Sequence, residues 1–145
     1  MSTFIRQYKG NFKSALRWPD LDALWDTLRK RNEGQWYLYA VGEAPPVEPA
    51  SKNDLEKFIG ATDKLLREEH EEDYCGIVYA DSLETPTMIK IYDPNNLGVV
   101  CGFSDNPPLP GWVLSTAPPE DLPQAFPPPG NRRRWWKTIF SGLSQ

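Results

Sequence analysis

The sequence predicts an α+β fold: a four- or five-stranded, mainly antiparallel sheet with two amphipathic helices on one face. Two segments, 19–31 and 51–69, repeat apolar residues at helical spacing. Shorter segments between and after them are rich in β-branched and aromatic residues, as strands are. The resulting order is α-β-α-β-β-β, and the short links between the last strands favour antiparallel pairing. A chain of 145 residues suits one domain with a buried core.

Residues 1–18 show no clear periodicity and predict a short strand or an irregular segment. The first helix is predicted over residues 19–31, where four apolar residues at positions i, i+3, i+4 and i+7 share one face. They are Leu21, Leu24, Trp25 and Leu28. Pro19 fits the first turn, because the N–H that it lacks would have no partner there.

Residues 35–42 predict a central strand, because alternate side chains on both of its faces are apolar or aromatic. The second helix is predicted over residues 51–69. Ser51 can cap its N-terminus, and Asp54, three residues later, resembles the acidic partner of a capping box. One face of this helix is apolar and consists of Leu55, Phe58, Ile59, Thr62, Leu65 and Leu66.

Three further strands are predicted over residues 74–80, 87–92 and 97–103. Asp93-Pro94-Asn95-Asn96 predicts the turn between the last two, since proline presets φ and asparagine tolerates a left-handed conformation. Residues 112–115 predict at most a short edge strand. The preceding Pro107–Trp112 segment is interpreted as a rigid crossing that places Trp112 at one end of the sheet, with a polyproline ligand as the alternative.

Proline-rich sequence separates this body from the C-terminus. Nine of the 15 prolines lie between Pro107 and Pro129, and the consecutive prolines 118–119 and 127–129 cannot lie inside helices or central strands. We therefore expect a single α+β domain over residues 1–116, an extended linker over 117–130 and a basic aromatic segment over 131–145. This last segment holds four basic residues and no acid, so it carries +4 while the rest of the chain carries −8.

The C-terminal segment predicts a short amphipathic helix, with apolar residues at helical spacing and basic residues around them. The residues expected to dock it are Arg132, Arg133, Arg134, Trp135, Trp136, Lys137, Ile139 and Phe140. Tryptophan and arginine are frequent anchors of protein interfaces, which favours a groove on a partner protein. An anionic membrane surface is an alternative, and packing on the protein's own domain is another.

The sequence predicts no catalytic residue, no metal site and no cofactor. The single histidine, His70, lies in a run of acidic residues without metal-ligand spacing. Cys75 and Cys101 are interpreted as small buried residues, and the alternative is a nucleophilic Cys75 activated by His70. A pair of carboxylates leaves no local motif, so Asp81, Glu84 and Asp93, near predicted strand ends, are the acids to inspect.

Charge and hydropathy narrow the function classes. The net charge is −4, and only Lys90 places a cation within the strands, so nucleic-acid binding is not expected. No run of 18 apolar residues and no secretory signal is present, which predicts a cytoplasmic protein. The preferred hypothesis is a non-enzymatic adaptor or accessory protein that binds a protein partner through its C-terminal segment. The alternatives are a small enzyme or small-molecule-binding domain with a site between sheet and helices, and recruitment to an anionic membrane.

Overall fold

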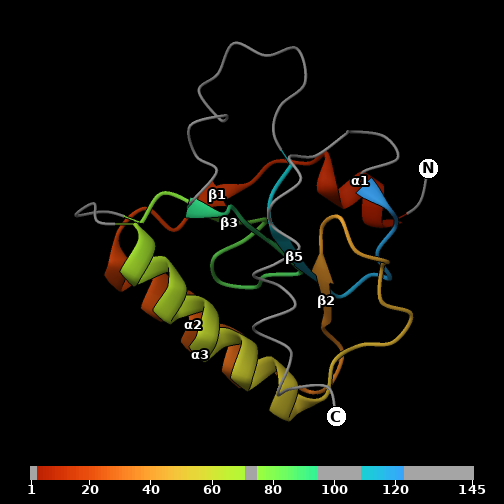
Figure 1. Cartoon of the computed structure of the whole chain (residues 1–145), viewed down its shortest axis with the longest axis horizontal. Coiled ribbons are helices and arrows are strands. Elements are labelled where there is room, and N and C mark those ends of the chain that lie inside the picture. Colours follow the sequence, from red (N-terminus) through yellow and green to blue (C-terminus); the bar gives the residue numbers. More distant parts are fainter. Residues whose placement is uncertain (1–2, 71–74, 95–108, 123–145) are drawn as a thin grey trace.

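Five antiparallel strands form an open sheet at the centre of the computed structural model, which describes residues 3–70, 75–94 and 109–122 (Figure 1). The strand order across the sheet is β1-β3-β4-β5-β2. The strands are β1 (Lys13–Ser14), β2 (Tyr37–Ala40), β3 (Val78–Ala80), β4 (Met88–Ile91) and β5 (Trp112–Ser115). With helices between and before the strands, the predicted α+β class and the antiparallel sheet are confirmed.

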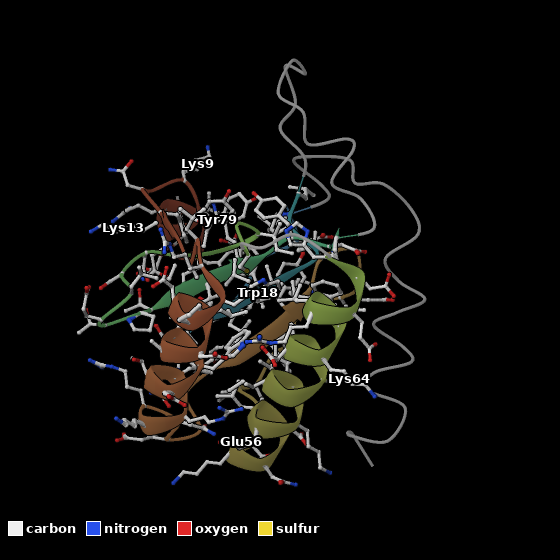
Figure 2. All side chains as sticks on the ribbon, turned by 90° about the vertical axis from the view of Figure 1, so that its left-hand side faces the viewer. Lys9, Lys13, Trp18, Glu56, Lys64 and Tyr79 are labelled. Atoms are coloured by element: carbon white, nitrogen blue, oxygen red, sulfur yellow. The ribbon has the colours of Figure 1, made fainter. Side chains whose placement is uncertain are left out.

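Helices α2 (Trp18–Lys30) and α3 (Lys52–Glu69) lie side by side on one face of the sheet, as predicted (Figures 1 and 2). Their apolar faces enter one core cluster with alternate side chains of the strands. The Ser51 hydroxyl accepts a hydrogen bond from the Asp54 N–H at 3.1 Å, which confirms the expected N-cap of α3. Arg67 of α3 donates to Asp63 and to Asp22 of α2, so it links the two helices at their exposed side.

The position of β2 differs from the sequence prediction. Within the described part of the chain, β2 lies at an edge of the sheet and pairs only with β5, whereas β5, expected at an edge, lies between β4 and β2. Both faces of β2 are nevertheless covered, since Ala40 packs in the cluster under α2 and α3 and Tyr39 in a second cluster opposite. Apolar residues on both faces of a strand therefore indicate that both faces are covered by other layers of the protein. They do not indicate that the strand has a neighbouring strand on each side.

The second face of the sheet is covered by helix α1 (Thr3–Tyr8) and by the chain around β5, away from α2 and α3. The sequence predicted a strand or irregular chain where α1 lies. Its Phe4 is 1 % exposed and packs against Tyr39, with 6.1 Å between ring centroids. The Leu122 N–H donates to the Tyr39 hydroxyl at 3.0 Å, and burial raises the pKa of Tyr39 to about 12. This hydroxyl stays protonated at physiological pH and serves as a structural contact.

Several predictions concern residues outside the described ranges. The predicted strand over 97–103, residues 123–130 of the expected linker and the whole C-terminal segment 131–145 belong to this group. The first residues of the expected linker do lie in the structure, where Ala117 and Leu122 are buried in the second cluster. Trp112 is 1 % exposed and begins β5, where it lies opposite the last residues of β4 and β2, so it stands at one end of the sheet as expected. In the described part of the chain, no helix is long and apolar enough to cross a membrane.

Candidate functional site

A transverse row of side chains crosses the second face of the sheet. Strand register places Ser14, Tyr79, Lys90, Val113 and Tyr39 opposite one another, in that order from β1 to β2. Val113 and Tyr39 are fully buried in the second cluster, whereas Tyr79 and Lys90 are only partly covered. The face is thus closed over β5 and β2 and more open over β3 and β4.

A cavity of about 370 Å³ lies at this more open part of the face, between the sheet and the chain that connects α1 to β1. We call it the Lys90 cavity. Its lining residues come from three separate segments: Gly10, Asn11 and Phe12; Gly76, Ile77 and Tyr79; Lys90 and Tyr92. They meet because β1 pairs with β3 and β3 pairs with β4, which brings residues about 80 positions apart into contact.

Lys90 is the charged group of the cavity. Its Nζ donates to the Tyr8 carbonyl oxygen at 2.7 Å and lies 4.0 Å from the ring centroids of both Tyr8 and Phe12. No carboxylate in the described ranges forms an ion pair with it. Burial lowers the pKa of Lys90 to about 8, because removing an ammonium from water disfavours its charged form.

Two tyrosines form another part of the wall. The rings of Tyr79 and Tyr92 meet edge to face, with 5.7 Å between centroids and 83° between planes. Burial, with a smaller contribution from Tyr79, raises the pKa of Tyr92, so its hydroxyl is protonated and can donate a hydrogen bond. The cavity therefore combines aromatic surface with one amine and two phenol groups.

Gly76 shapes the start of β3 beside the cavity. Its φ of 68° lies in the left-handed region, where a side chain would be strained. The Cys75 N–H donates to the Leu16 carbonyl at 2.7 Å, and the Tyr92 N–H donates to the Ile77 carbonyl at 2.9 Å. These bonds on either side of the bend fix Ile77 and Tyr92 at the cavity wall.

The acids singled out in the sequence do not assemble into a site. Asp81 accepts hydrogen bonds from the N–H groups of Ser82, Thr87 and Met88 and from the Thr87 hydroxyl, so it organises the β3–β4 turn. Glu84 contacts the Ser82 hydroxyl in the same turn. Asp93 is buried and does not line the cavity.

His70 and Cys75 show no catalytic arrangement either. His70 ends α3, and its ring centroid lies 6.2 Å from that of Trp18. Cys75 is fully buried and burial raises the pKa of its thiol, as expected of a small core residue and unlike a nucleophile. Within the described ranges, no group of three potential ligands could hold a metal ion. Cys101 and the eight docking residues expected in the C-terminal segment lie outside those ranges.

The sequence contained one signal of the Lys90 cavity. Lys90 interrupts the otherwise apolar strand Met88–Ile91. Alternation predicts that Lys90 and Met88 share a face, and a lysine beside a buried methionine is unusual on a covered sheet face.

No family model, curated protein or solved structure matches the chain.

Proposed function

We propose that this protein is a small-molecule-binding domain whose ligand occupies the Lys90 cavity. The observation that carries the proposal is a partly buried lysine, without a carboxylate partner in the described ranges, on the wall of a cavity of about 370 Å³. Ligand sites commonly measure about 300–1000 Å³ and combine apolar and aromatic walls with a few polar groups. This site lies on the opposite face from α2 and α3, not between them and the sheet.

The energetics of Lys90 support a ligand. Moving an ammonium out of water is costly unless hydrogen bonds or opposite charge compensate for the lost hydration. The Tyr8 carbonyl and the two aromatic rings compensate in part. An ammonium has three N–H donors, and among the described residues one acceptor, the Tyr8 carbonyl, bonds to it. A ligand with an acceptor group would compensate for more of the cost.

The test is to add a library of small soluble fragments to the full chain and to detect their binding by two-dimensional NMR. We expect the amide signals that shift to cluster on residues 10–12, 76–79 and 90–92. Lys90→Met should weaken this binding at least about tenfold, since it removes a charge-assisted donor but keeps the length of the side chain. Lys64→Met is the matched control, because Lys64 is exposed on α3, far from the cavity (Figure 2). Shifts that avoid the cavity, or equal binding by the Lys90→Met variant, would contradict the proposal.

A second candidate is the adaptor function, favoured by the charge reversal between the body and residues 131–145. Removing these residues should leave the melting temperature within about 2 °C and abolish capture of a protein partner, since the segment would dock outside this domain. Sedimentation with anionic and with neutral vesicles, in parallel, separates a protein groove from a membrane surface. A fall of many degrees would instead show that the segment packs on its own domain.

A further inference from the structure

The charges around the Lys90 cavity are positive although the chain as a whole is acidic. Residues 10–12, which form one wall, are flanked by Lys9 and Lys13, and both lysines are exposed. Figure 2 shows Lys9, Lys13 and Tyr79 at one end of the molecule, with Glu56 and Lys64 at other places on it. No acidic residue lines the cavity among those described. Lys13 pairs with Ala80 and so lies on the other face of β1, but Lys9 and Lys90 both place positive charge at the cavity, which attracts an anion.

The polar groups of the wall are rich in donors. The Lys90 ammonium only donates, the Tyr79 and Tyr92 hydroxyls can donate, and the Asn11 amide offers two further N–H groups. An ionised carboxylate is an acceptor with two oxygens, so it complements such a set. Phosphate is better matched by forked arginines or by successive backbone N–H groups at a helix N-terminus, and neither lines this cavity in the described ranges.

The rest of the wall is mainly apolar. Phe12, Tyr79 and Tyr92 present aromatic rings, and Ile77 adds an aliphatic surface. Edge-to-face and offset contacts with such rings favour an aromatic ligand. The volume is at the lower end of the range for ligand sites, which limits the ligand to about one ring and a short substituent.

We infer that the Lys90 cavity binds a small aromatic carboxylate, whose carboxylate meets the Lys90 ammonium while its ring packs against Phe12 and the two tyrosines. The inference rests on the proposed function and specifies the ligand class of the same site. It differs from the general proposal in one respect: a neutral ligand of equal shape should bind much more weakly.

Matched pairs of probes test this difference. Benzoate and phenylacetate are titrated into the full chain at low salt beside their neutral amides, benzamide and phenylacetamide, with acetate and inorganic phosphate as ring-free anions. We expect both aromatic carboxylates to bind at least about tenfold more tightly than their amides, and both ring-free anions to bind more weakly. Lys90→Met should abolish the preference for the carboxylate, whereas Lys64→Met should retain it.

The pH dependence of the same titration is a second readout. The titratable groups that face Lys90 are tyrosines: Tyr8 from α1, Tyr79 from β3 and Tyr92 after β4, while Ser14 of β1 and Val113 of β5 do not titrate. A bound carboxylate stabilises the protonated amine, so affinity is full below the Lys90 pKa and declines above it. Affinity should therefore fall about tenfold between pH 7 and pH 9, and Lys90→Met should remove this fall.

Each outcome decides between the two proposals. If amides bind the cavity as tightly as carboxylates, or if the preference survives in Lys90→Met, the ligand class is wrong and the cavity remains a binding site. If phosphate or acetate binds as tightly as benzoate, the aromatic part of the inference is wrong. If the aromatic acids, the amides and the fragment library all fail to shift the cavity signals, both the inference and the proposed function are overturned.

Discussion

Replacing Trp112 with alanine is expected to lower the free energy of unfolding by about 3–5 kcal/mol, the usual range when a large aromatic side chain is removed from a core. Trp112 is 1 % exposed and lies in the core cluster under α2 and α3. The register places it between Ile91 and Ala40, the last residues of β4 and β2, so the cavity left by alanine would open between this end of the sheet and the two helices.

Urea unfolding monitored by circular dichroism measures this loss in the free energy of unfolding. Circular dichroism is used because the substitution removes a tryptophan and so alters the fluorescence signal. The control is Trp18→Ala, since Trp18 is partly exposed and contacts Arg67 at 4.8 Å from its ring centroid. It should cost about 1–2 kcal/mol. Trp112→Phe keeps most of the apolar volume. If the alanine variant does not fold, this milder variant still allows the loss of stability to be measured. Equal losses for Trp112 and Trp18 would contradict a central position for β5.

The helices α2 and α3 could be predicted because their signal is local. Four apolar residues within eight positions specify one helix face, and a serine followed by an acid specifies where a helix begins. Helix α1 has only six residues, too few for a repeat to appear in the sequence. Strand order has no comparable local signal, since the partner of β2 is β5, more than 70 residues later. The sequence of β2 shows that both of its faces are covered. It does not show how many strands pair with its edges, because helices and loops can cover the faces of an edge strand too.

The candidate site could be predicted only in part, for the same reason. Lys90 was visible as the lone cation of the strands predicted from the sequence, but its companions in the cavity come from two other segments of the chain. Residues 10–12 and 76–79 reach Lys90 only through the pairing of β1 with β3 and of β3 with β4. The acids near predicted strand ends were visible too, but the sequence did not show that Asp81 accepts hydrogen bonds from backbone donors of its own turn.

Asp81 leads to the second large expected effect: Asp81→Ala should cost about 2–3 kcal/mol of stability. Its Oδ1 accepts from the N–H groups of Ser82 and Thr87 at 2.9 Å and of Met88 at 3.1 Å, while its Oδ2 accepts from the Thr87 hydroxyl. A single carboxylate therefore satisfies three backbone donors where the chain turns from β3 into β4. Alanine leaves these partly buried donors without their acceptor, and leaving a buried donor unsatisfied costs about 1–3 kcal/mol.

The matched control is Glu84→Ala in the same turn, whose exposed carboxylate contacts only a side-chain hydroxyl among the described residues, at 3.4 Å. Chemical denaturation should show a change within about 0.5 kcal/mol for this variant. Asp81→Asn should lie between the two, because its amide oxygen still accepts but carries no charge. The turn also sets the register that places Tyr79 opposite Lys90, so amide hydrogen exchange in β3 and β4 should accelerate in Asp81→Ala. Similar stabilities for the Asp81 and Glu84 variants would show that the turn does not depend on this carboxylate.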